Sequence, residues 1–474
     1  MKCLGLTITF ASAIIGTLAG GGNPPCSATD PAAYDSRDII HRDVVIVGGG
    51  SSGVYSAMRL KDHGKTVMVV EKKDVLGGHA EAWFDPDTGT PVDIGVVVFA
   101  HTDTVRDYFA RFNLSLTPLT GTSKPQYVDF TTGKMVNYTE PDAAAFGAAL
   151  DSYVNQLNNY PALQDSFNMT YPVHPDLLLS FGDFVAKYQL QDLVPKVFLY
   201  NQGAVPLLNI SMVYTFKYLN LDEVDSFKQG SLSLDHNSVT ELYRRAAASL
   251  GPDVLVNSTV KSMYRSNLDE VRVAVSTPAG PKLVVAKKIL STIPPLPDNL
   301  DGYDLSANET SLFGQFFANG YYTAVMNNTG LENAQLTNHG PGRPYGVPEL
   351  PGIYTMNSRP LPGNRSVTQV YYGSPSVLPD EEVKAEIVKS LRRFQAENGL
   401  PETEPTWLKF SSHSPFNLMV PNDNIAAGFY DQLFSLQGQR NTFYNGAAWH
   451  SQGSSVLWEF TDRYIIPIML ASME

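Results

Sequence analysis

The hydrophobic positions of this chain form short unbroken runs and longer runs with helical spacing. Residues 44–47 and 67–70 are continuous apolar stretches, which are typical of strands buried on both faces. Between them, Val54, Ala57 and Met58 are spaced along one face of a helix. The pattern therefore predicts a strand, a helix and a second strand in close succession.

The same criteria predict the other elements of the chain. A helix over 381–398 is the clearest, because it follows Pro379 and Asp380 and ends before Gly399. Its apolar stripe is expected to lie in the core and consists of Val383, Ile387, Leu391 and Phe394. Further strands are predicted at 254–261, 271–275, 283–285, 320–326 and 367–372, and further helices at 181–188, 239–250 and about 456–465.

Three glycines follow the first strand in the pattern G-x-G-x-x-G. Gly48 permits a tight turn, Gly50 lets the backbone approach a pyrophosphate, and Gly53 lets the next helix pack closely on the strand. Ser51 and Ser52 are suited to cap that helix, whose N-terminal N–H groups and dipole attract phosphate. These residues predict one edge of a dinucleotide site.

An acidic residue completes the pattern. Gly64 is suited to end the helix, and Glu71 then ends the second strand, where a carboxylate accepts hydrogen bonds from ribose hydroxyls. Glu71 and the adjacent Lys72 are therefore candidate cofactor-binding residues. A carboxylate here disfavours the 2′-phosphate of NADP, but the fingerprint alone leaves FAD and NAD open.

The next motifs carry a family resemblance. Gly77-Gly78-His79 follows Glu71, and Asp93-Ile94-Gly95 follows after a further turn. In this order the chain resembles the FAD-dependent amine oxidase superfamily, which has the glutathione-reductase-like flavin fold. The resemblance implies FAD, with Gly78 and His79 near its pyrophosphate and ribityl chain and Gly95 in a segment that runs beneath the flavin. The family's usual Arg after the glycine pair is His79 here.

Two later segments extend the resemblance. Val260 occupies the place of a Val that contacts adenine through its backbone, ahead of a strand that ends in Pro294-Pro295. Near the C-terminus, Gly446 is expected beside the ribityl chain. Ser455 and Val456 begin a last helix that points at the flavin, while the family's acid after the glycine is Ala447 here.

The implied fold class is α/β, with a Rossmann-like FAD-binding domain and an inserted α+β substrate domain. The FAD-binding domain is expected at 43–115, 245–310 and 431–474, and the substrate domain at 116–244 and 311–430. Gly340-Pro341-Gly342 lacks a strand–helix frame and predicts a loop, so no second dinucleotide domain is expected. Electrons should therefore come from a small organic substrate, with O2 as the natural acceptor.

Composition narrows the class of protein. The 474 residues contain 34 Lys and Arg against 47 Asp and Glu, which gives a formal net charge of −13. This acidic balance argues against a nucleic acid partner, because phosphate binding needs a basic face. The two cysteines, Cys3 and Cys26, are too few for a disulfide scaffold or a four-thiolate metal site, and no metal is expected. Neither cysteine lies near the C-terminal motif, where the superfamily's cysteinyl flavin link is found.

The N-terminus resembles a cleavable secretory signal over 1–19. Lys2 precedes an apolar run over 4–18 that is too short to span a bilayer, and Thr17-Leu18-Ala19 provides small residues for cleavage. Residues 20–42 would form an N-terminal arm, and no later segment predicts a transmembrane helix. Secretion would permit N-glycans at some of the sequons at Asn113, Asn137, Asn168, Asn209, Asn257, Asn308, Asn327 and Asn364.

The chemistry is predicted only at the level of class. Many members of the superfamily place a Lys near flavin N5, but no Lys lies between Lys288 and Lys384. This departure favours the branch resembling β-cyclopiazonate dehydrogenase, a group associated with fungal secondary metabolism. The resemblance implies removal of a hydride with oxidative cyclisation or desaturation. A flavin amine or amino-acid oxidase and a redox-neutral flavin isomerase are the alternatives.

No catalytic residue is assigned from the sequence. Tyr321, Tyr322, Trp449 and His450 are pocket candidates by family position. His79 or His101 could carry a covalent histidyl flavin link. We favour for His79 a hydrogen bond to the pyrophosphate or ribityl chain.

Overall fold

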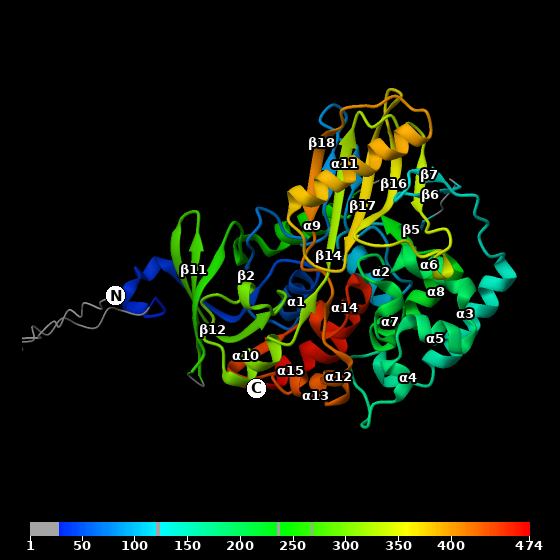
Figure 1. Ribbon diagram of the computed structural model, residues 1–474. Coiled ribbons are helices and arrows are strands. Elements are labelled where there is room, and N and C mark those ends of the chain that lie inside the picture. Colours follow the sequence, from blue (N-terminus) through cyan, green and yellow to red (C-terminus); the bar gives the residue numbers. More distant parts are fainter. Residues whose placement is uncertain (1–27, 120–123, 235–237, 267–268) are drawn as a thin grey trace, which may run out of the picture.

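The computed structural model describes residues 28–119, 124–234, 238–266 and 269–474. The predicted signal peptide, Cys3 and Cys26 lie outside these described residues. Two seven-stranded sheets, three two-stranded sheets and a group of helices form the described chain (Figure 1). This arrangement confirms the predicted α/β class, with mixed sheets and an additional helical region.

The first sheet is built from strands that lie far apart in the sequence. Its order is β10-β11-β12-β1-β2-β9, with β20 beside β12. β1 pairs in parallel with β12 and β2, and β20 is parallel to β12. The strands are β1 (Ile39–Val47), β2 (Val67–Val70), β9 (Val254–Leu255), β10 (Thr259–Tyr264), β11 (Val271–Thr277), β12 (Gly280–Ser291) and β20 (Thr442–Tyr444).

Two sequence predictions for this sheet were wrong in extent. The predicted strand at 254–261 is two strands, because Asn257 has φ +48° and its N–H turns to the carbonyl of Lys73. The predicted strand at 283–285 is the middle of the 12-residue β12, which runs on to Ser291 and brings Thr292 beside the first glycine turn.

The second sheet has the order β18-β14-β17-β16-β15-β6-β7. Helix α11 (Asp380–Glu397) lies across it, and the predicted stripe of Val383, Ile387, Leu391 and Phe394 is buried, as expected (Figure 1). The strands are β6 (Gln126–Asp129), β7 (Lys134–Met135), β14 (Gly320–Asn327), β15 (Gln335–Asn338), β16 (Gly352–Leu361), β17 (Arg365–Ser374) and β18 (Thr406–Ser412).

Alternation along β14 decides which side chains face the first sheet. Tyr322 packs in one core with Val383 and Ile387 of α11, on the outer face. Val325 packs instead with Ile94, which belongs to the segment after the glycine pair. Because side chains alternate along a strand, Tyr321 and Thr323 share the inner face with Val325.

The helices lie around both sheets and extend to one side. The predicted helices at 181–188 and 239–250 are confirmed as α5 and α9, and no described helix is long and apolar enough to cross a bilayer. The helices that later sections use are α1 (Ser51–Asp62), α6 (Val194–Tyr200), α7 (Met212–Tyr218), α9 (Thr240–Leu250) and α14 (Ser454–Phe460). The others are α2 (Asp103–Arg111), α3 (Ala143–Leu157), α4 (Pro175–Leu178), α5 (Phe181–Tyr188), α8 (Leu221–Gln229), α10 (Ala307–Phe313), α12 (Asn422–Ala426), α13 (Phe429–Phe434) and α15 (Ile466–Ala471).

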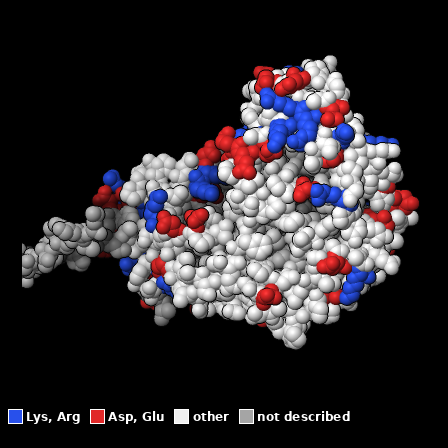
Figure 2. Space-filling view, in the orientation of Figure 1, with Lys and Arg blue, Asp and Glu red and all other residues white. Residues whose placement is uncertain are grey.

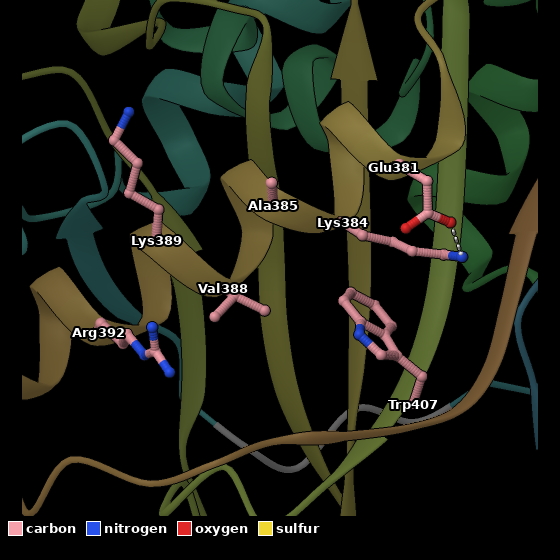
Figure 3. A pocket seen from close by; sticks show the side chains of 7 residues that line it. All are labelled: Glu381, Lys384, Ala385, Val388, Lys389, Arg392 and Trp407. Atoms are coloured by element: carbon pink, nitrogen blue, oxygen red, sulfur yellow. Dashed lines mark hydrogen bonds and ion pairs between the residues drawn. The ribbon is translucent and has the colours of Figure 1, made fainter.

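Basic side chains gather on the surface near α11 (Figure 2). A shallow groove lies there, and Figure 3 shows Lys384 reaching above Trp407 to its ion pair with Glu381. The groove is lined by residues of α11 and β18 and shares none with the glycine turns described next.

Candidate functional site

The turn between β1 and α1 needs glycine at two positions for reasons within the protein. Gly48 has φ +104°, and a Cβ there would lie 2.6 Å from Thr292 Oγ1. A Cβ on Gly53 would lie 1.9 Å from the carbonyl oxygen of Gly48. Gly50 differs, because the nearest atom to its Cβ would be Gly78 Cα at 3.7 Å. The open space at Gly50 fits the close approach of a bound pyrophosphate.

The start of α1 carries no side-chain cap. We predicted Ser51 and Ser52 as capping residues, and this was wrong, because the helix begins at Ser51 and its N-cap is Gly50. The Ser51 hydroxyl instead donates to Ser454 Oγ at 2.9 Å and accepts the Trp458 indole N–H at 3.0 Å. Among the described residues, none supplies a capping side-chain oxygen to the backbone N–H groups in the first turn of α1, which suits an anionic ligand.

Glu71 closes the glycine turn from the end of β2. It is 5% exposed, and its carboxylate accepts the N–H groups of Gly49 and Lys73, both at 2.7 Å. Lys72 is exposed, whereas Lys73 donates to the carbonyl of Gly78 at 3.0 Å and pairs with Glu81. The sequence suggested Lys72, but the structure brings Lys73 to the glycine turns.

The glycine pair lies directly against the first turn. Gly50 and Gly77 form a parallel bridge, and a Cβ on Gly78 would lie 2.9 Å from Gly50 Cα, with Gly78 at φ +61°. Gly95 crosses behind this loop, where a Cβ would lie 1.7 Å from the His79 carbonyl oxygen. Val260 is half-buried on β10. The residues just before it, Leu255 and Ser258, form backbone hydrogen bonds with Glu71 at the end of β2.

The C-terminal motif brings a second helix N-terminus to the same place. Gly446 follows β20 with φ +108°, and a Cβ there would lie 3.2 Å from the Thr292 carbonyl oxygen. The last helix was predicted from about residue 456, but α14 begins at Ser454, and helical structure continues through a π segment to Ala471. Ser455 and Val456 are buried in its first turn, and Ser455 Oγ accepts the Ala100 N–H at 2.9 Å.

Beside the glycine loops lies a group of rings that we call the aromatic cluster, formed by His79, Tyr321, Tyr371, His413 and Phe416. His79 stacks on His413 with centroids 4.6 Å apart, and Tyr321 lies 4.9 Å from Phe416. Tyr371 stacks on Tyr321 at 6.2 Å. This cluster joins the glycine loops to the inner face of the second sheet.

The loop after α6 covers this cluster. The Tyr321 hydroxyl donates to Gln202 Oε1 at 2.8 Å, and the Gly203 N–H donates to the Tyr354 hydroxyl at 3.0 Å. Burial raises the pKa of Tyr321 well above its usual value, so this phenol stays protonated. Asn201 is 2% exposed, and its side-chain amide has no hydrogen-bond partner in the described protein.

His79 is uncharged where the family has arginine. Burial, reinforced by the charge of Lys73, lowers the pKa of His79 to about 4. His79 can therefore give a cofactor a neutral hydrogen bond but no positive charge. His101 points elsewhere, since its ring nitrogens contact the Gly230 carbonyl and Arg106.

The remaining pocket candidates have different surroundings. The prediction that Tyr322 lines the pocket was wrong. Tyr322 faces α11, where its hydroxyl donates to the Leu378 carbonyl. Trp449 stacks on Tyr444 in the core, and His450 contacts the buried Lys217 Nζ at 2.9 Å. Burial lowers the pKa of Lys217 well below its usual value. Of these candidates, Tyr321 alone is in the aromatic cluster.

Most of the site residues predicted from the sequence thus lie on glycine turns and at two helix N-termini that meet at one place, with Glu71 at the end of β2 and Val260 on β10. Such a set of glycines and unpaired helical N–H groups suits the pyrophosphate of a dinucleotide. The buried rings beside it suit a flat cofactor or substrate. The class of protein that this defines is a dinucleotide-binding redox enzyme.

Comparison with known proteins gives the family. Residues 51–457 match the family of flavin-containing amine oxidoreductases, and the chain belongs to it. FAD is its cofactor, and its chemistry is that of an oxidoreductase. An FAD-dependent oxidoreductase of Apiospora sacchari, dpasF, is 37% identical over 468 residues, 95% of this chain and 98% of the relative. The β-cyclopiazonate dehydrogenase of Aspergillus oryzae is 36% identical over 439 residues, 91% and 94% of the two chains.

Solved structures agree on the fold. A fatty acid isomerase of P. acnes that produces CLA superposes with a TM-score of 0.73 at 18% identity, over 92% of this chain and 99% of that one. Putrescine oxidase superposes with a TM-score of 0.65 at 16% identity, over 91% and 100%. The expected amine-oxidase-like fold and FAD cofactor are therefore confirmed.

The two glycines of the first turn should respond differently to alanine. Gly50→Ala should leave the melting temperature of the FAD-free protein nearly unchanged, because its methyl group would make only an ordinary contact with Gly78 Cα at 3.7 Å, yet lower the FAD content of the purified protein. Gly53→Ala should lower both, since its Cβ would overlap a backbone oxygen. Flavin absorbance per chain and thermal unfolding measure this, and equal FAD content in Gly50→Ala and wild type would contradict it.

The neutral state of His79 predicts how stability changes with pH. Its pKa is about 4 in the folded protein and 6.5 in its reference state, so between these values the unfolded chain binds more protons. The free energy of unfolding should fall as pH drops through this window, by up to about 1.4 kcal/mol per pH unit from this one group.

Urea unfolding at pH 7, 6 and 5 measures this slope. His79→Asn should make it shallower, and His63→Asn, at an exposed position, is the matched control away from the site. If the slope in His79→Asn equals that of wild type, His79 binds a proton equally well in the folded and the unfolded protein, which would contradict this prediction.

Proposed function

We propose that this protein oxidises an organic substrate without a positive charge, of the kind made in fungal secondary metabolism. A hydride and a proton leave the substrate, a ring closes or a double bond forms, and O2 finally takes the electrons. The observation that carries this proposal is the inner face of β14, which offers Tyr321 and Thr323 where an amine oxidase of this family would offer lysine.

The charges around the aromatic cluster favour a substrate without a positive charge. Beside His79 and His413, Glu81 binds Lys73 and lies 3.8 Å from Lys409. Beside Tyr371, the charged groups are Arg359 and Asp93. The aromatic cluster itself contains no carboxylate. A substrate ammonium next to the two imidazoles would therefore meet two lysines with one carboxylate between them, and burial would strengthen that repulsion.

The names of the relatives support the same class of reaction. Oxidoreductases of fungi and a β-cyclopiazonate dehydrogenase match this chain over nearly their whole length. FAD supplies the hydride acceptor when it is bound. The rings of the aromatic cluster would orient a flat substrate by contact, and the loop at Gln202 would keep water from it.

Reduction of the bound flavin without O2 tests this function. We expect the FAD-loaded protein to lose its flavin absorbance with β-cyclopiazonate, the compound in the name of one relative, and to keep it with primary amines. Admitting air should restore the colour and release hydrogen peroxide. Tyr321→Ala should slow the bleaching at least tenfold, whereas Tyr322→Phe, on the opposite face of β14, should match wild type.

Other outcomes identify the alternatives. Bleaching by primary amines or amino acids alone would contradict the proposal and favour an amine or amino-acid oxidase. A product with the same oxidation state as the substrate, formed without net uptake of O2, would favour a redox-neutral isomerase.

We also propose that the protein is secreted and carries N-glycans. All eight sequon asparagines are exposed on the described chain, whereas fewer than half of the other described asparagines are. Exposure of every acceptor is what glycosylation in the secretory pathway requires. The apolar run at 4–18 supports the same route.

Expression in a fungal host tests the secretory route. The protein should appear in the medium, start at residue 20, and lose mass when N-glycans are removed enzymatically. Protein that stays in the cells with an intact N-terminus and an unchanged mass would contradict this.

A further inference from the structure

His413 is a residue of the aromatic cluster that no sequence motif pointed to. It follows β18, its side chain is 1% exposed, and its N–H donates to the Tyr321 carbonyl at 2.9 Å. Its ring lies nearly parallel to that of His79, at an interplanar angle of 17°. His79 itself lies between Gly78 and Gly95, so His413 is one ring away from the glycine loops.

The ring nitrogen Nε2 of His413 is buried and has no hydrogen-bond partner in the described protein. Buried polar groups in native proteins are nearly always paired, because an unpaired one loses the hydrogen bonds it had in water. His79 cannot serve as the partner, since the two rings are stacked face to face. The missing partner therefore belongs to a molecule that the protein binds.

The electrostatic surroundings decide what His413 can offer that molecule. The charged and titratable groups that act on it are His79, Lys73 and Lys409, and burial together with these groups lowers its pKa well below the usual value. A neutral imidazole has one N–H donor and one acceptor nitrogen. It thus suits the carbonyl and ring nitrogen atoms of a flavin better than a phosphate, which would favour a cation.

We propose that His413 is a second imidazole of the FAD site, and that its Nε2 forms a hydrogen bond with the bound cofactor. The stacked pair His79 and His413 then takes over, without charge, part of the role of the family's arginine. His79 extends from the glycine pair, and His413 reaches the same ligand from the second sheet.

Replacement of the ring nitrogen tests the proposal. His413→Phe keeps a ring stacked on His79 but removes Nε2, so FAD should bind roughly threefold to tenfold more weakly, as expected for one lost buried hydrogen bond. The visible absorbance envelope of the bound flavin should also change. The control is His339→Phe, because the His339 ring also stacks on an aromatic side chain, that of Tyr138, with ring centroids 4.2 Å apart.

Titration of FAD-free protein with FAD measures both the FAD affinity and the absorbance spectrum of the bound flavin. Unchanged FAD affinity and an unchanged flavin spectrum in a folded His413→Phe protein would overturn the proposal. Histidine NMR of the wild-type protein tests the proposal even if the His413→Phe variant does not fold. The His413 signal, assigned through His413→Asn, should shift when FAD is added. A signal that moves only when β-cyclopiazonate is added to FAD-loaded protein would assign Nε2 to the substrate and overturn the proposal.

Discussion

The hydrogen bond between the hydroxyls of Ser51 and Ser454 joins the first turns of two helices that are about four hundred residues apart in sequence. The Trp458 indole N–H donates to the same Ser51 oxygen, so α14 is fixed against α1 at two points. Both helices start there without a side-chain cap. Their partial positive charges therefore add at one place, and a bound cofactor with phosphate groups and a reducible ring is the natural partner.

The first sheet makes this meeting of helices possible. β12 lies between β1 and β20, all three parallel, so their carboxyl ends open at one edge. Thr292 follows β12 and lies against both Gly48 and Gly446. A Cβ on Gly48 would meet the Thr292 hydroxyl, and a Cβ on Gly446 would meet the Thr292 carbonyl oxygen. Ligands of open α/β sheets bind at this edge, and the second sheet closes over it with Tyr321 and His413.

Local motifs could be predicted from the sequence because their parts are close in the chain. Gly48, Gly53 and Glu71 belong to one strand–helix–strand unit, and the structure gives each the position its spacing implied. Ser51 was misassigned as a cap because its true partner is Ser454, which no local pattern reveals.

The substrate side was harder to predict for the same reason. Strand alternation says that Tyr321 and Tyr322 face opposite ways, but only the packing of α11 decides which one faces the cofactor. His413 meets His79 across more than three hundred residues, so neither sequence pattern nor family position could pair them. Lys73 was missed because adjacent lysines look alike until the fold turns one of them toward Gly78.

The absorption spectrum of the purified protein, before and after denaturation, tests most directly that these two helix N-termini and glycine turns hold FAD. Our account predicts an oxidised flavin spectrum, with one FAD per chain released or retained on unfolding. A colourless protein that takes up no FAD on reconstitution, or one that binds NAD in its place, would contradict it.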